Sequence, residues 1–335
     1  MAGGPHAHLG PVEPAARQAV PRHRDLPHAP RLTGYAAAVS SAGRFAALDP
    51  LLPPPVPLAS GDRLRAVTAS GTQVSAMLQR YRHGPGDAPL LWSAAEVWQL
   101  FPDPETAGTE GFDALLGALR SQVDTEAPGA DSACVVNWPS RDAEAIRAFL
   151  DHGLVPLSAL AVRPAVAPED AAADASIRLA GPDDYPAALA LCTATFDYTG
   201  LVAHRKREQT AELLGPALRR ALGEKATWLA EVDGEVAALA QCDWVQSAPG
   251  NEAAELLPTG RWGYVNNVVT APASRGRGIG RALMARAHRE LLNQGATGTY
   301  LYYNPTNPLS SVFWHRQGYR PLWTSWEAHP AWALR

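Results

Sequence analysis

Cysteine is scarce in this chain, and so are the residue spacings that hold disulfides or metals. The 335 residues include 3 cysteines, Cys134, Cys192 and Cys242, which lie far apart and form no CxxC pair. We therefore expect buried free thiols and a reducing compartment, because disulfide scaffolds need an even, closely spaced set of cysteines. The 10 histidines show no ligand spacing either, so no metal site is expected.

Long apolar runs and an excess of positive charge are also absent. No stretch reaches the ~18 apolar residues of a membrane span. The N-terminal residues are interrupted by Pro, His and Arg, so they lack the ~7–15-residue apolar core of a secretory signal. The formal net charge of -4 argues against a nucleic-acid partner. These absences predict a cytoplasmic protein that works without a membrane or nucleic acid.

Proline and small acidic residues mark the expected domain boundaries. Eleven prolines crowd the first 60 residues, too many for a packed helix or a central strand. Residues 1–61 are therefore expected to form a Pro-rich arm, with a short helix near 34–48. A small, acidic, Pro-bearing linker is expected at 166–176. Two folded segments, 62–165 and 177–335, remain.

The second segment alternates between strands and helices, which predicts an α/β fold with a mixed sheet. Asp233-Gly234 stands between two apolar runs and supplies the tight turn of a hairpin. A helix is expected at 281–292, because its apolar residues recur on one face. Another helix is expected at 205–222.

The two segments also resemble each other. Aligning Gly153 with Gly318 gives a strand–helix–strand unit in both segments and places Asp142 against Asn307. Such a repeat suggests a duplicated fold, although any strand–helix–strand unit gives a similar pattern.

The most informative stretch is a glycine-rich turn between a β-rich run and the helix at 281–292. It reads Arg275-Gly276-Arg277-Gly278-Ile279-Gly280. Glycine lets the backbone approach a ligand, and a helix N-terminus adds unpaired N–H donors and partial positive charge. The stretch therefore predicts a phosphate-binding loop. It is neither a Walker loop, which needs GxxxxGK followed by Ser or Thr, nor a dinucleotide fingerprint, whose third glycine is missing here.

At these residues the sequence resembles the GCN5-related N-acetyltransferase (GNAT) superfamily. The family's pyrophosphate motif, Arg/Gln-x-x-Gly-x-Gly/Ala, is matched by Arg275, Gly278 and Gly280. A second family motif is matched by Asn307, Ser310, Phe313, Trp314, Gly318 and Tyr319. The resemblance covers nearly all of 177–335. It implies two tandem acyl-CoA N-acyltransferase-like domains, of which the N-terminal one is degenerate because it lacks the pyrophosphate motif.

The resemblance also implies which residues contact acetyl-CoA. The strand end before the loop would offer backbone groups to the pantetheine arm, as an added strand would, and the loop amides would hold the pyrophosphate. The start of the second motif would hydrogen-bond the pantetheine or phosphate region. The expected contacts are Val268, Val269, Thr270, Arg275, Gly276, Arg277, Gly278, Ile279, Gly280, Asn307 and Ser310.

Direct acyl transfer needs a positioned amine, a hydrogen-bond donor for the developing oxyanion, and an acid and a base. The resemblance places the oxyanion donor at a backbone N–H near Val269. The family's usual acid is a Tyr at the position of Trp314, and indole cannot serve. Tyr302 or Tyr303 on the adjacent strand could replace it, or could simply pack; Tyr303 is the acid we nominate.

The base is less clear from the sequence, since no Glu occupies the strand before the loop. Asn267, beside Asn266, could order a water, and Asp243 on the hairpin strand offers a carboxylate. Each also has an ordinary hydrogen-bonding role. The catalytic candidates are therefore Tyr303, Asn267 and Asp243.

The expected function is transfer of an acetyl or similar acyl group from acetyl-CoA, as cosubstrate, to the primary amine of a small molecule. The alternative is a non-catalytic acyl-CoA sensor or partner module, which Trp314 and the missing Glu favour slightly. The acceptor is set by loops such as 247–261, which carry little pattern. A homodimer is left open.

Overall fold

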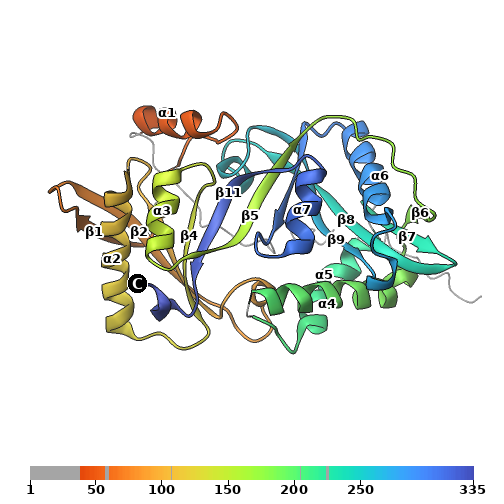
Figure 1. Cartoon of the computed structure of the whole chain (residues 1–335), viewed down its shortest axis with the longest axis horizontal. Coiled ribbons are helices and arrows are strands. Elements are labelled where there is room, and N and C mark those ends of the chain that lie inside the picture. The colour runs from red at the N-terminus through yellow and green to blue at the C-terminus, as the bar shows by residue number, and fades with distance from the viewer. Residues whose placement is uncertain (1–37, 57–59, 107, 204, 224–225) are drawn as a thin grey trace, which may run out of the picture.

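One sheet extends through the part of the chain that the computed structural model describes, residues 38–56, 60–106, 108–203, 205–223 and 226–335 (Figure 1). Eleven strands form it in the order β1-β2-β3-β4-β11-β5-β10-β9-β8-β7-β6. The strands are β1 (Asp62–Val67), β2 (Gln73–Arg82), β3 (Glu96–Pro102), β4 (Ser132–Pro139), β5 (Val155–Pro164), β6 (Ser176–Leu179), β7 (Thr227–Val232), β8 (Glu235–Ser247), β9 (Gly260–Thr270), β10 (Gly298–Tyr303) and β11 (Arg320–Ala328). The expected mixed α/β sheet is confirmed.

The α-helices of the described residues fall into two groups, α1–α3 around the end of the sheet that holds β1–β4 and α4–α7 around the other end (Figure 1). They are α1 (Ala38–Leu48), α2 (Gly108–Glu126), α3 (Ala143–Asp151), α4 (Tyr185–Val202), α5 (Thr210–Ala221), α6 (Ile279–Asn293) and α7 (Pro308–Arg316).

Local sequence accounts for several of these boundaries. The hairpin between β7 and β8 turns at Asp233 and Gly234, both with positive φ (51° and 82°), as the sequence predicted. Asp142 caps α3 and Asn307 caps α7, each accepting a hydrogen bond from a backbone N–H of the first turn. The helix expected from residue 205 begins at Thr210 instead.

The strand order places the last strand of each half inside the other half. β11 lies between β4 and β5, and β5 lies between β11 and β10. β11 pairs antiparallel with β4, and β5 pairs antiparallel with β10. The segments 62–165 and 177–335 therefore share one sheet, because each segment completes the part of the sheet that the other forms.

The registers of the two halves repeat with the 165-residue offset that separates Gly153 from Gly318. Applied to the β4–β11 pair Trp323–Pro139, this offset gives Ser158–Asn304, which continues the β5–β10 register. The parallel pair Val97–Ala133 of β3 and β4 becomes Trp262–Gly298 of β9 and β10. The same offset superposes α3 on α7.

The N-terminal arm is shorter than the sequence suggested. Residues 1–37 lie outside the described residues, but α1 and the turn after it belong to the folded body. Phe45 is 3% exposed, and its ring packs edge-on against Trp138 and Trp323. Asp49 is 1% exposed and accepts hydrogen bonds from Arg320 of β11. The prolines that follow α1 therefore end a helix without preventing it from docking.

Candidate functional site

The parallel strands β9 and β10 separate partway along their length. Their ladder joins Trp262–Val265 to Gly298–Leu301. Beyond it, β9 continues beside β8 and β10 continues beside β5. We call the place where two parallel strands stop pairing a splay. Backbone groups on the facing edges of a splay are available to a ligand that adds itself as a strand.

A β-bulge marks the position of this splay. Gln241 of β8 pairs with Asn267, whereas the next residue, Cys242, pairs with Val265. Asn266 is therefore the extra residue, and its side-chain oxygen accepts a hydrogen bond from the Tyr264 hydroxyl at 3.1 Å. Bulges bend a strand and redirect its side chains, and they occur often beside active sites.

Beyond the bulge, alternate amides of β9 face the splay. The amide of Ala271 donates to the Ala237 carbonyl of the neighbouring β8 at 2.8 Å. Since amides alternate in direction along a strand, the N–H of Val269 also points to β8. The N–H groups of Val268 and Thr270 then point to the opposite side, into the splay.

The glycine-rich turn leads directly from the end of β9 into α6. Gly276 and Gly278 have φ values of 77° and 79°, a left-handed conformation that glycine adopts without steric cost. Gly278 is the N-cap residue of α6, so the first amides of the helix lack intrahelical partners and point outward with the positive end of the dipole. The turn is exposed and suits the oxygens of a phosphate.

The remaining residues of the turn show how close it lies to the splay. A side-chain carbon at Gly280 would lie 3.3 Å from the Thr270 hydroxyl and 3.6 Å from the Phe313 ring. Arg275 donates through Nε to the Thr270 carbonyl at 3.2 Å. Arg277 is exposed and lies 3.8 Å from Asp174. The turn, the end of β9 and the start of α7 thus form one continuous site.

Asn307 and Ser310, the expected contacts in the second motif, have local roles. Asn307 is 8% exposed, and its side-chain oxygen accepts from the amides of Leu309 and Ser310 at 3.0 and 3.4 Å. The Ser310 hydroxyl donates to the Asn304 carbonyl at 3.4 Å. These contacts fix the start of α7 beside the splay.

The catalytic candidates fall on two faces of the sheet. Asp243 lies directly opposite Tyr264 in the β8–β9 ladder, and directly opposite residues share a face. Asn267 lies opposite Gln241, two residues from Asp243, so Asn267 and Asp243 also share that face. The structure thus brings together Asp243 and Asn267, two of the three catalytic candidates that the sequence suggested.

Tyr303 lies on the other face. It packs with Trp314 in the core under α6 and α7, and its ring meets His315 edge-on. Tyr302 instead packs edge-on against Tyr264 at 6.4 Å between ring centroids, which places it with Asp243. Burial raises the pKa of both tyrosines above the usual value, so both stay protonated donors near neutral pH.

Helix α4 covers the face that carries Asp243 and Asn267. The side-chain amide of Asn267 donates to the sulfur of Cys192 on α4 at 3.0 Å. Cys192 and Val269 belong to the same buried cluster, and burial raises the pKa of the Cys192 thiol to about 12. Cys192 is therefore a neutral packing residue that holds α4 against the end of β9.

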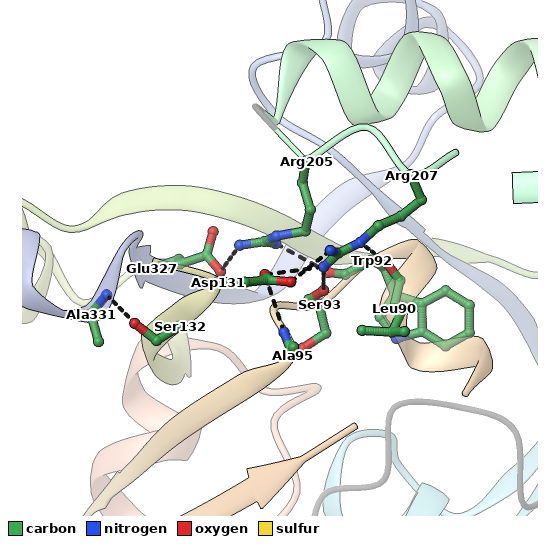
Figure 2. Close-up of polar contacts among 10 residues, drawn as sticks. All are labelled: Leu90, Trp92, Ser93, Ala95, Asp131, Ser132, Arg205, Arg207, Glu327 and Ala331. Carbon is green, nitrogen blue, oxygen red and sulfur yellow. Dashed lines mark hydrogen bonds and ion pairs between the residues drawn. The ribbon is translucent and has the colours of Figure 1, made fainter. Parts of the chain in front are cut away.

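The connection between α4 and α5 is anchored on the N-terminal half of the sheet (Figure 2). Arg205 donates to Glu327 of β11 at 2.5 Å, and the two side chains are 3% and 5% exposed. Arg207 donates to both carboxylate oxygens of Asp131 at 2.6 and 3.1 Å. Burial raises the pKa of Glu327, and Arg205 opposes that shift. Sequence analysis missed these pairs because their partners are far apart in the chain.

A second carboxyl that sequence analysis missed is Glu255, in the short 3₁₀-helix Glu252–Glu255 after β8. Burial, and then the neighbouring charge of Glu252, raises the pKa of Glu255 to about 7. A carboxyl with such a pKa can exchange a proton near neutrality. In the sequence only its position in the loop 247–261 pointed to it.

A buried polar chain holds α6 on the sheet. His288 of α6 is 1% exposed and hydrogen-bonds the Tyr319 hydroxyl at 2.8 Å. That hydroxyl also hydrogen-bonds Thr299 of β10 at 2.8 Å. Burial, and then the charge of Arg163, lowers the pKa of His288 from 6.5 to about 3.

The unfolding free energy should accordingly fall at acid pH through His288. The folded state keeps this ring neutral, whereas the unfolded chain protonates it below pH 6.5, so the stabilisation is complete above that pH and is lost on the way to pH 3. We expect the wild type to lose up to about 1.4 kcal/mol per pH unit more than His288→Gln in this window. Urea unfolding of both proteins at pH 7 and 5.5 measures the difference, and parallel pH slopes would contradict it.

Comparison with known proteins agrees with this geometry. Residues 195–319 match the model of the acetyltransferase (GNAT) family. This part of the chain has the sequence pattern of a GNAT domain. The matched range runs from α4 to the residue after Gly318 and includes the splay, the turn and α7. The protein is accordingly an acyltransferase.

The chain is also similar to solved structures at low identity. A GCN5-related N-acetyltransferase from Sphaerobacter thermophilus is 15% identical with a TM-score of 0.44, over 81% of this chain and 82% of that one. One from Kribbella flavida is 16% identical with a TM-score of 0.43, over 88% and 97%. The PaiA N-acetyltransferase from Thermoplasma acidophilum, in complex with coenzyme A, is 13% identical with a TM-score of 0.36, over 46% and 98%. No curated protein matches the chain.

None of the helices in the described residues is both long enough and apolar enough to cross a membrane. No group of three or more His, Cys, Asp or Glu side chains in the same residues is arranged to hold a metal ion.

Proposed function

We propose that the protein transfers an acetyl group from acetyl-CoA to the primary amine of a small molecule. One observation carries the proposal: the splay between β9 and β10 opens beside a glycine turn whose free amides begin α6. An extended pantetheine arm needs backbone partners along a strand edge, and a diphosphate needs a cluster of N–H donors. The two lie next to each other here.

In this proposal the acetyl group reaches the splay near the bulge. The amides of Val268 and Thr270 face it, and we take the Val268 N–H as the donor to the developing oxyanion. The sequence placed this donor near Val269, whose own amide points to β8. The amine, which is the nucleophile, approaches from the face that carries Asp243 and Asn267, under α4.

Proton transfer completes the proposed reaction. The amine nitrogen attacks the thioester carbonyl, and Asp243 takes the amine proton directly or through a water that Asn267 orients. The thiolate leaves as the carbonyl reforms. Tyr302, which shares a face with Asp243, is the better placed proton donor to that sulfur, while Tyr303 faces α7.

Free thiol release from acetyl-CoA tests the function. The full chain is incubated with acetyl-CoA and a panel of primary amines that includes aminoglycosides, polyamines and amino acids. Amine-dependent thiol release supports acetyl transfer. Acetyl-CoA binding without turnover over a broad panel would overturn it in favour of an acyl-CoA sensor.

Replacing Asp243 by Asn tests the proposed base. Since general-base catalysis contributes about 100-fold or more, kcat should fall by about that factor with the best amine of the panel, while the Kd for acetyl-CoA stays unchanged. Glu235→Gln removes a carboxylate from the exposed start of the same strand and should leave kcat unchanged. Equal activity of the two variants would exclude Asp243 as the base.

The N-terminal half enters the proposal as a duplicated copy of the same fold. The repeated registers and the matching caps of α3 and α7 support duplication. Within it, the position of Asn307 is taken by Asp142 and that of Tyr303 by Trp138. The copy supplies β4 and β5 to the shared sheet and anchors the α4–α5 connection.

A further inference from the structure

The N-terminal half contains its own splay. The parallel ladder of β3 and β4 joins Glu96–Leu100 to Ser132–Val136 and ends there. The 165-residue offset carries its last pair, Leu100–Val136, onto Val265–Leu301, the last pair of β9 and β10. The two splays therefore occupy equivalent positions in the two halves.

The helix beside this second splay does not present the equivalent of the glycine turn to a diphosphate. Helix α2 begins at Gly108, so residues equivalent to the glycine turn lie inside its first turns. Phe112 and Leu115 are 1% and 0% exposed and belong to the hydrophobic core. Glu110 and Asp113 add negative charge to the same turns, which would repel phosphate oxygens.

Helix α1 places an arginine across the second splay. The guanidinium of Arg44 donates to the carbonyls of Pro104, at 3.3 Å, and Thr106, just beyond the splayed end of β3. It also donates to the carboxylate of Asp142 at 2.6 Å. Asp142 caps α3 as Asn307 caps α7. Arg44 thus joins the strand end and the helix start that flank the splay.

The next residue of α1 adds an apolar contact at the same place. The ring of Phe45 lies 5.5 Å from that of Trp138, at the end of β4, with an interplanar angle of 87°. Trp138 donates through its indole N–H to Asp142 at 2.9 Å. Arg44, Phe45, Trp138 and Asp142 therefore form one connected set of contacts.

We propose that α1 closes the N-terminal splay. Its Arg44 binds the end of β3 and the cap of α3, and the equivalents of these two elements in the C-terminal half are the proposed contacts of the cofactor. The chain then has two splays of common origin, one open to acetyl-CoA and one filled by its own helix. This inference rests on the proposed function, which assigns acetyl-CoA to the first splay. It predicts one acetyl-CoA per chain.

Calorimetric titration of the full chain with acetyl-CoA tests the stoichiometry. We expect one molecule bound per chain. Two molecules per chain would overturn the inference, because the second splay would then be accessible. Absence of any uptake would refute the proposed function, and the stability comparison with Arg44 variants would still decide whether α1 holds the splay closed.

Arg44→Met keeps the apolar stem but removes the donors to three acceptors. Because Asp142 is 5% exposed, it would lose its charged partner inside the protein, and the melting temperature should fall by about 4 °C. Acetyl-CoA should bind with unchanged Kd at the distant first splay. Arg63→Met removes an exposed pair with Asp103, whose side chains are 44% and 37% exposed, and should shift the melting temperature by about 1 °C or less. Equal melting temperatures for the two variants would overturn the role of Arg44.

Discussion

Gly278→Glu is expected to abolish acetyl-CoA binding. The substitution introduces a carboxylate at the N-cap of α6, where the proposed site gathers the free amides for the diphosphate. It also places a side chain at φ 79°, which disfavours the turn itself. Charge-assisted hydrogen bonds contribute about 1.5–3 kcal/mol each, so losing two of them weakens binding by a factor of about 100 or more. Calorimetric titration with acetyl-CoA measures the loss.

Gly295→Glu is the matched control for this experiment. Gly295 follows the other end of α6 with φ 87°, and a side-chain carbon there meets nothing within 4 Å. The two variants carry the same new charge and a similar backbone strain at opposite ends of one helix. Gly295→Glu should bind acetyl-CoA like the wild type. Tight binding by Gly278→Glu would show that the turn is not the diphosphate site.

Arg205→Met is expected to cost about 3–5 kcal/mol of unfolding free energy, the usual effect of removing one partner of a buried ion pair. Both side chains of the pair are almost fully buried, so Glu327 would be left without its partner in the interior. Its pKa, already raised by burial, would rise further. The deficit should therefore be larger at pH 7 than at pH 5, because a raised pKa lets Glu327 take up a proton as the pH falls. Urea unfolding at both pH values measures the effect.

Two further variants separate this effect from a general loss of arginine. Arg82→Met removes a pair with Glu96 in which the arginine side chain is 83% exposed, and should cost about 0.5 kcal/mol or less. Arg205→Met combined with Glu327→Gln removes the unpaired charge and should recover part of the loss. If Arg205→Met is as stable as Arg82→Met, the Arg205–Glu327 pair contributes nothing measurable to the free energy of unfolding.

The parts of the site that depend on neighbouring residues could be predicted from the sequence. The glycine turn, the start of α6 and the cap of α7 are fixed by which residue follows which, since φ freedom and capping act over a few positions. The hairpin at Asp233-Gly234 was predictable for the same reason. The alignment of Gly153 with Gly318 also proved to be the offset of the repeated registers.

Pairing between distant segments could not be predicted. Nothing in the pattern of β5 or β11 tells which strand will lie beside it, because either partner buries the same apolar face. The bulge at Asn266 adds one residue to β9 and exchanges the faces of the side chains beyond it, and no local turn signal in the sequence marks its position. The docking of α1 was hidden by the surrounding prolines. The sequence also named Tyr303 and Asp243 as candidates for one catalytic site, whereas they lie on opposite faces of the sheet.

The exchange of β5 and β11 has a practical consequence for anyone who expresses the protein in pieces. A fragment that stops after β10 would leave both β4 and β5 without the strand that joins them. A fragment that starts after β5 would leave β10 with a bare edge. Unpaired strand edges promote aggregation, so either piece alone should be insoluble.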